Sequence, residues 1–219
     1  FDIDNFFNEL KQTQDLVIGY IKLSQSDTSP EQFSPFINKA GAEIETRTID
    51  YNDQEIFERK LKRILTEFQN RNIRHIAINS YYSLSEANIE QELISHCRKI
   101  VGDHFSYHSI NPFISPNFLV HENTLLINTI FKDIVYKILN EIKSVITEFQ
   151  FPLPLLVASA DGSLTDQEQV LDYPFLTWQS GLTAKAIGAG IYTNNTNAII
   201  ILPYKNGLQF GVLKDRKAL

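Results

Sequence analysis

Several residue types are scarce or missing in this sequence. Of its 219 residues only Cys97 is a cysteine, so no disulfide can form within the chain and a reducing, cytoplasmic compartment is expected. Methionine is absent even at position 1, as expected of a processed or excised segment or of a sequence from which modified methionines are omitted. No apolar run is long enough to cross a bilayer and no signal peptide begins the chain. We therefore expect no membrane partner.

Positive charge is also in short supply. The chain has 20 Lys and Arg against 26 Asp and Glu, and the cations are scattered along it, so no dedicated nucleic-acid surface is expected. Metal-ligand spacing is equally weak among the histidines. His104 and His108 would share a helix face beside Asp103, but the residues between them are typical of a strand. A structural or surface histidine is the preferred interpretation, and no metal site is predicted.

An alternation of strands and helices dominates the first half. Apolar or alternating segments predict strands over 16–23, 42–49 and 74–79, and apolar residues at helical spacing predict the surest helix over 53–71. Such alternation favours a mostly parallel sheet, so the predicted fold class is α/β, with a mixed, mostly parallel sheet and flanking helices. The charged residues of the predicted helix are interpreted as a solvated face.

Two carboxylates follow the third predicted strand. Glu90 and Glu92 are two positions apart and therefore face different sides of a helix. They are interpreted as surface carboxylates of that helix and not as a catalytic pair.

Two prolines bracket an extended segment over 111–116, which is the predicted junction between two regions. An N-terminal α/β region is predicted over 1–112 and a second α/β region over 113–219. The second region begins with a long amphipathic helix that continues to about Phe149, and it ends in a β-hairpin.

Short elements are predicted after the long helix. The apolar run 154–158 is expected to form a buried strand that ends in a turn at Asp161-Gly162. The Thr165-x-x-Glu168 pattern has the form of a capping box, so a helix is expected to start there.

The last strands and the helix before them have clear local signals. The run Ala198–Leu202 is typical of a strand buried on both faces, and Asn206-Gly207 favours a two-residue hairpin loop. Ser180-Gly181 precedes a run of small residues and can begin a helix whose free backbone amides bind an anion. The alternative, which we prefer, is that the small residues let a helix and a sheet approach closely.

The order of these motifs resembles the hydantoinase/oxoprolinase family over roughly residues 70–217. The residues that carry the resemblance are Asp161-Gly-Ser-Leu, Pro174, Ser180-Gly181, Ile187-Gly-Ala and Asn197-Ala-Ile, and earlier Glu122, Asn123 and Asn128. The resemblance implies a partial actin-like (ribonuclease H-like) ATPase architecture, ATP and magnesium as cofactors, and hydrolysis of a cyclic amide such as a hydantoin or oxoproline.

The phosphate-binding hairpin of that family has lost its functional residues here. The family has Asp-Met-Gly-Gly-Thr-Thr-Thr-Asp, where this chain places Leu202 on the first Asp, Tyr204 and Lys205 on the glycines, and Gln209 on the last Asp. Bulky side chains stand where backbone amides would close around phosphate, and a magnesium ligand is missing. The amino-terminal glycine-threonine phosphate loop of the family is not visible either.

Two functions are therefore carried forward. The preferred one is a non-catalytic binding or scaffold subunit, as a homo-oligomer or beside a partner subunit, which predicts an exposed apolar patch on the helix of 123–149 or around Trp178. The alternative is an active hydrolase of a cyclic amide, ATP-assisted or with a partner subunit, which predicts a cleft with a perturbed carboxylate or histidine. The catalytic candidates are Asp161, Glu122 and His121, and the cofactor-binding candidates are Ser180, Gly181 and Lys205.

Overall fold

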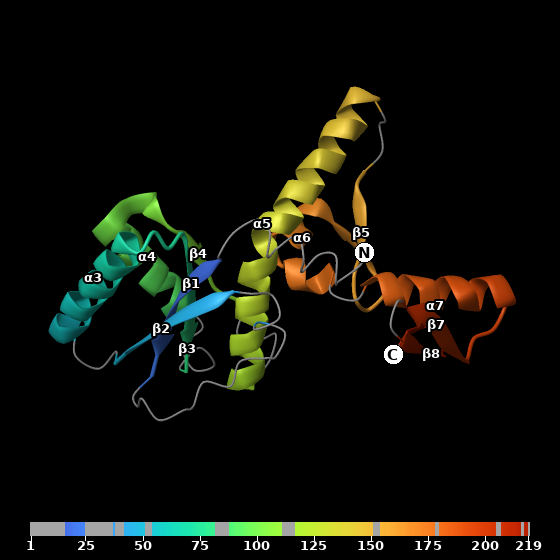
Figure 1. The fold of residues 1–219 in the computed structure, drawn as a ribbon, viewed down its shortest axis with the longest axis horizontal. Coiled ribbons are helices and arrows are strands. Elements are labelled where there is room, and N and C mark those ends of the chain that lie inside the picture. The colour runs from blue at the N-terminus through green and yellow to red at the C-terminus, as the bar shows by residue number, and fades with distance from the viewer. Residues whose placement is uncertain are drawn as a thin grey trace. The chain divides into compact units, whose positions relative to one another are not determined.

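A four-stranded parallel sheet is the main element of the structure, a computed structural model that describes residues 16–24, 37, 42–50, 54–81, 88–110, 117–150, 154–177, 180–204, 207–215 and 217–218. The strands are β1 (Val17–Leu23), β2 (Glu43–Ile49), β3 (His75–Ser80) and β4 (Ser106–His108), in the order β2-β1-β3-β4. Helix α3 (Gln54–Asn70) lies between β2 and β3 in the chain, and α4 (Ile89–Val101) and the short η1 (Gly102–His104) lie between β3 and β4. The predicted α/β class with a parallel sheet and flanking helices is confirmed (Figure 1).

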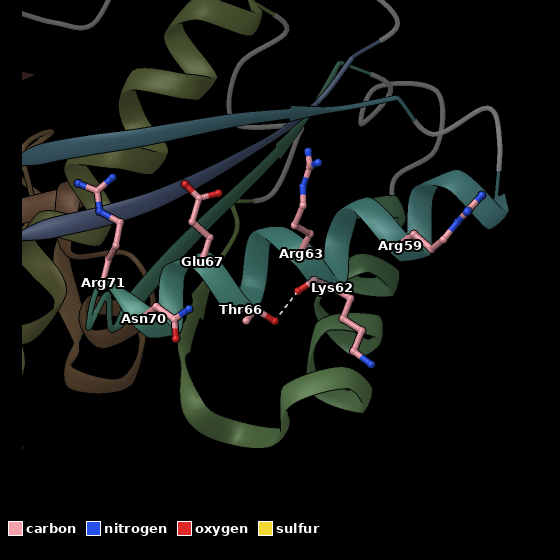
Figure 2. A pocket seen from close by; sticks show the side chains of 7 residues that line it. All are labelled: Arg59, Lys62, Arg63, Thr66, Glu67, Asn70 and Arg71. Carbon is pink, nitrogen blue, oxygen red and sulfur yellow. Dashed lines mark hydrogen bonds between the residues drawn. The ribbon is translucent and has the colours of Figure 1, made fainter.

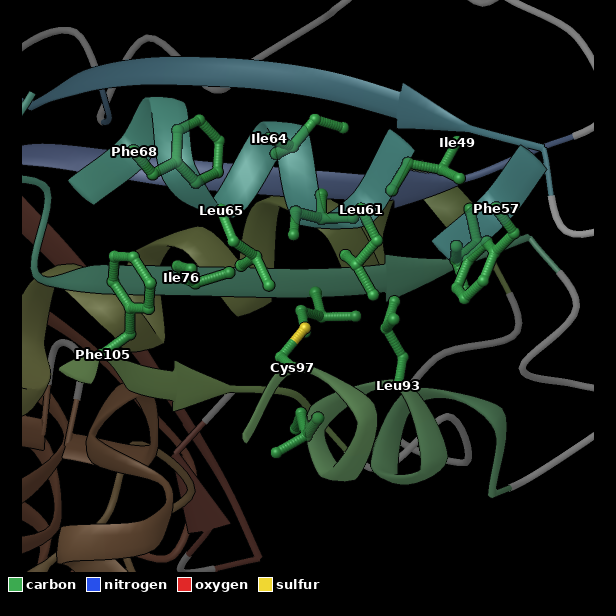
Figure 3. Packing of buried hydrophobic residues seen from close by; sticks show 14 of the residues in the cluster. Ile49, Phe57, Leu61, Ile64, Leu65, Phe68, Ile76, Leu93, Cys97 and Phe105 are labelled. Atoms are coloured by element: carbon green, nitrogen blue, oxygen red, sulfur yellow. The ribbon is translucent and has the colours of Figure 1, made fainter. Parts of the chain in front are cut away.

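One face of this sheet is apolar and packs against α3 and α4. Ile21 and Leu23 of β1 join Ile76 and Ile78 of β3 in a cluster with the apolar side chains of both helices (Figure 3). Gly19 belongs to the same face, where an added Cβ would stand 2.5 Å from the ring of Phe68. The missing side chain therefore lets α3 pack directly on β1.

The opposite face of the sheet is unusually polar. Because side chains alternate along a strand, Tyr20 and Lys22 of β1 and His75 and Asn79 of β3 point away from α3 and α4, and all four are buried. The first turns of α5 (Phe118–Glu148) contact this face through hydrogen bonds described below. The polar face therefore carries the side chains of this sheet that can form hydrogen bonds and ion pairs.

The chain divides into two units, Asp2–Ile130 and Phe131–Leu219. The sequence-based boundary after residue 112 stays a prediction. The described elements of the second unit after α5 are β5 (Leu156–Ala158), β6 (Leu164–Asp166), α6 (Gln167–Asp172), η3 (Pro174–Thr177), α7 (Ser180–Thr193), β7 (Ala198–Tyr204), β8 (Gly207–Lys214) and β9 (Lys217–Ala218). β5 and β6 form a small antiparallel pair, and β7, β8 and β9 form an antiparallel sheet.

Local details of the second unit differ from the sequence-based predictions. The strand expected to be buried near 154–158 pairs with a single neighbour, so Leu156 is exposed. Helix α6 is capped by Asp166, whose carboxylate accepts the backbone N–H of Gln169, because Thr165 is used in β6. In the hairpin, Tyr204 pairs with Gly207, so Gly207 belongs to the strand and not to the loop.

The largest correction concerns β7. The run Ala198–Leu202 is buried on one face only, since Ile199 is 74% exposed and Ile201 is also exposed. Continuous apolar sequence predicts a strand covered by layers on both faces, but within the described residues only α7 covers this sheet. No helix in the described parts of the chain is both long and apolar enough to span a membrane.

Candidate functional site

The polar face of the parallel sheet carries a buried network near the carboxyl ends of β1 and β3. The chain leaves β1 for β2 on one side and later returns to add β3 on the other side of β1. In open α/β sheets this change of direction is where the carboxyl ends of neighbouring strands most often form a binding site. The network is therefore the candidate functional site of the first unit.

Four side chains form a continuous chain of hydrogen bonds. The hydroxyl of Tyr20 donates to Glu122 Oε1 at 2.7 Å and accepts the side-chain amide of Asn79 at 3.2 Å. The Asn79 carbonyl Oδ1 lies 3.0 Å from Nδ1 of His121. The network thus joins two adjacent strands to the first turns of α5.

His121 has oxygen acceptors at both ring nitrogens. Its Nδ1 faces the carbonyl Oδ1 of Asn79, and its Nε2 lies 3.2 Å from the backbone carbonyl of Ile110. The orientation of the Asn79 amide is set by its donation to Tyr20, whose own proton goes to Glu122. Because neither oxygen can donate, each contact is a hydrogen bond only where the facing ring nitrogen carries a proton.

Lys22 brings a cation to the same place. Its Nζ is 3.9 Å from Glu122 Oε1 and 5.0 Å from the centre of the Phe118 ring, and both Lys22 and Glu122 are buried. A buried carboxylate is tolerated where a cation and hydrogen-bond donors surround it. Glu122 has both, through Lys22 and Tyr20.

Glu90 is the second carboxylate at this end of the sheet. It lies in the first turn of α4, is only 4% exposed, and accepts the backbone N–H of Ser80 at 2.9 Å. Burial raises its pKa to about 7, against an opposing effect of the Ser80 hydrogen bond. The interpretation of Glu90 as a surface carboxylate is therefore wrong, whereas Glu92 is exposed as expected.

The electrostatics of Tyr20 follow from these neighbours. Burial, and then the charge and hydrogen bond of Glu122, raise the pKa of the Tyr20 phenol well above its usual value, and Glu90 adds to the effect. Tyr20 therefore stays protonated and acts as a hydrogen-bond donor to Glu122. The hydrogen bonds of the network orient its own members, and Glu90, with a pKa near neutrality, can exchange a proton.

A pair of histidines lies on the same face, one strand further along. His75 Nδ1 is 3.1 Å from His108 Nε2, and the two rings are stacked. The histidine spacing in the sequence pairs His108 with His104, but His104 is exposed. Within the described ranges no three His, Cys, Asp or Glu side chains gather as a metal site would require.

The structure brings together two of the three catalytic candidates. His121 and Glu122 are buried and connected through Asn79 and Tyr20. Asp161 belongs to the second unit, where its carboxylate accepts both the backbone N–H and the hydroxyl of Ser163, and these bonds lower its pKa. Asp161 therefore shapes a turn in a different unit.

The cofactor-binding candidates lie in the second unit as well. Ser180 and Gly181 begin α7 and are partly buried, and Lys205 lies outside the described residues. No described contact assigns an anion to this helix start. The small residues do allow close packing, since a Cβ on Gly190 would stand 2.2 Å from a Leu213 methyl group.

Sequence reasoning missed Tyr20, Lys22, Asn79 and Glu90 as members of the site. The available signal was a polar side chain near the carboxyl end of each strand, Lys22 in Val17–Leu23 and Asn79 in His75–Ser80. Comparison with known proteins finds no matching family model and no matching curated protein. The site is therefore interpreted from its own geometry.

Proposed function

We propose that the protein is a binding or scaffold subunit that associates through the exposed apolar face of the β7–β8 hairpin. Cross-strand pairs on this face join Ile199 with Val212, Ile201 with Phe210, and Pro203 with Leu208. Each is an apolar pair, and Ile199, Ile201, Leu208, Phe210 and Val212 are all exposed. A contiguous apolar surface of this kind is typical of a protein interaction site. This face is the observation that carries the proposal.

The packing of the other face supports the same conclusion. Buried Ala186 of α7, Ile200 and Leu213 form the centre of the cluster beneath the sheet. The parallel sheet of the first unit has a much larger cluster with two helices. A sheet backed by so small a cluster of described residues gains stability when its exposed apolar face is buried against another protein surface.

The resemblance to the hydantoinase/oxoprolinase family is compatible with a subunit that has lost phosphate chemistry. Leu202, which stands where the hydantoinase/oxoprolinase family has its first Asp, packs against the cluster under the sheet and is paired with Gln209. An apolar side chain turned into the core cannot hold magnesium. We propose a divergent relative of that family, with part of an actin-like fold, that no longer uses this hairpin for phosphate chemistry.

The partner we propose is a second copy of the same chain. Most soluble homo-oligomers are two-fold symmetric dimers, in which one surface packs on itself. The exposed apolar pairs of the hairpin can pack on an identical face, with Lys214, which ends the same face of β8, left at the edge of the contact. Sedimentation velocity over a dilution series tests this: the proposal expects a dimer that dissociates on dilution. A monomer at every concentration would contradict it.

An active hydrolase is the second candidate. The observation that favours it is the buried network of Tyr20, Asn79, His121 and Glu122 beside Glu90, whose pKa is about 7. Calorimetric titration with magnesium-ATP, together with a hydrolysis assay on hydantoin and 5-oxoproline, distinguishes the two candidates. Binding that requires Ser180 or Lys205, or turnover that requires Glu122, would favour the hydrolase. Neither signal is expected of a scaffold subunit.

A further inference from the structure

The exposed side of α3, in the first unit, carries a group of basic side chains. Five of the chain's 20 Lys and Arg fall between positions 59 and 71. The sequence suggests scattered charge, but α3 and the residue after it bring four of these five to one side. Those four line an open groove of about 590 Å³ whose walls are Arg59, Lys62, Arg63, Thr66, Glu67, Asn70 and Arg71.

Two rows of side chains form this groove. Residues four apart on a helix stand above one another, so Arg59, Arg63, Glu67 and Arg71 form one row, and Lys62, Thr66 and Asn70 form the next (Figure 2). At about 1.5 Å per residue the longer row extends roughly 18 Å. A groove between two such rows is the surface into which a row of side chains from another helix packs.

The single carboxylate of the groove, Glu67, is already paired outside it. Glu67 is held by Arg47 of β2 through two hydrogen bonds, and this pairing is the main reason that its pKa is lowered. Arg71 is paired with Glu43 and Glu45 of the same strand. Within the described residues no ion pair engages Lys62 or Arg63, and both are exposed.

We infer that this groove, which we call the α3 basic groove, docks a helix of a partner protein that presents carboxylates four residues apart. Glutamates at that spacing are neighbours on a helix surface and would meet the exposed cations Lys62 and Arg63. The Asn70 amide adds both a donor and an acceptor for polar side chains. This inference does not depend on the β7–β8 face.

A protein partner fits the α3 basic groove better than a nucleic acid does. Single-stranded nucleic acid is held by aromatic side chains on which bases stack, and none of the seven residues that line the groove is aromatic. Duplex binding needs a strongly basic surface, whereas this chain carries a formal charge of -6. The exposed Ile56, one turn before Arg59 and Lys60, instead offers an apolar contact for a helix.

Fluorescence anisotropy on the full chain tests the inference with four labelled probes: an alanine-based helical peptide with glutamates four apart, the same peptide with glutamines, the same peptide with lysines, and a single-stranded DNA oligonucleotide. The variant replaces Arg59, Lys62 and Arg63 by Gln. Its control replaces Lys99, Lys137 and Lys185 by Gln, which removes the same charge from three separate places.

We expect the glutamate peptide to bind the wild type and the control equally, and the Arg59/Lys62/Arg63 variant about fivefold or more weakly, since each exposed ion pair contributes little alone. The glutamine peptide should bind none of the three. Replacing the same three residues by Glu should transfer binding to a lysine peptide. The inference is overturned if the glutamate peptide does not bind, if both triple variants weaken equally, or if the oligonucleotide binds as tightly.

Discussion

The hydroxyl of Tyr20 donates a 2.7 Å hydrogen bond to Oε1 of Glu122, a residue 102 positions further along the chain. Both groups are buried, and this bond connects the central strand β1 to the start of α5. The polar face of the parallel sheet is therefore held to its helix by specific hydrogen bonds, where the apolar face relies on close packing.

Removal of the Tyr20 hydroxyl should weaken the first unit measurably. Tyr20→Phe leaves Glu122 without its shortest donor and Asn79 without an acceptor, so we expect unfolding free energy to fall by about 1–3 kcal/mol. The matched control is Tyr81→Phe, an exposed tyrosine, for which about 0.5 kcal/mol or less is expected. Urea denaturation followed by circular dichroism measures both, and equal losses would show that the Tyr20 hydroxyl is not structural.

Glu90 should make stability depend on pH near neutrality. Its folded pKa of about 7 lies above the ordinary value of 4.5, so its contribution is fully present below about pH 4.5 and is lost as the pH rises through 7. The slope cannot exceed about 1.4 kcal/mol per pH unit for one proton.

Glu90→Gln should remove that dependence, because Gln can still accept the Ser80 N–H but cannot ionise. Hydrogen exchange at the β1 and β3 amides, measured between pH 5 and 8 with correction for intrinsic rates, follows the first unit alone. Glu92→Gln is the control and should retain the wild-type dependence, since Glu92 is exposed. An unchanged slope in Glu90→Gln would assign the titration to another group.

Two glycines of α7 provide a matched pair for the packing of the second unit. A Cβ on Gly190 would stand 2.2 Å from a Leu213 methyl and 3.1 Å from the carbonyl of Asn195, whereas nothing lies within 4 Å of one on Gly188. We expect Gly190→Ala to lose about 1–3 kcal/mol through overpacking. Gly188→Ala should gain up to about 1 kcal/mol from helix propensity. Thermal unfolding of both variants compares them, and similar behaviour would contradict the packing of α7 on β8.

The sequence predicted most of the parallel sheet because its signals are local. The strand at 16–23, the edge strand at 42–49 and the helix over 53–71 lie within a few residues of β1, β2 and α3. The strand 198–202 was also found, but its burial was not, because continuous apolar sequence does not show whether a second layer exists. The proposed function rests on the exposed apolar face of this strand.

The candidate site was predictable only in part. Glu122 and His121 stand next to each other in the sequence, in the segment that resembles the hydantoinase/oxoprolinase family. Tyr20 and Asn79 join them only because parallel pairing brings β1 beside β3. The burial of Glu90 is not predicted by the sequence. Helical periodicity shows which side of the helix a residue occupies, but Glu90 is buried by the nearby end of β3. Contacts between distant segments, which no local pattern encodes, therefore completed the site.

The contribution of the β7–β8 face to association is tested most directly by sedimentation of two variants of the full chain, each with one substitution in the second unit. Phe210→Glu places a charge in the exposed apolar face, and Tyr192→Glu places one on α7, at a side chain that is 91% exposed. The account predicts that Phe210→Glu is a monomer at concentrations where the wild type and Tyr192→Glu are dimers. A dimer that survives Phe210→Glu unchanged, or a wild type that never associates, would contradict it.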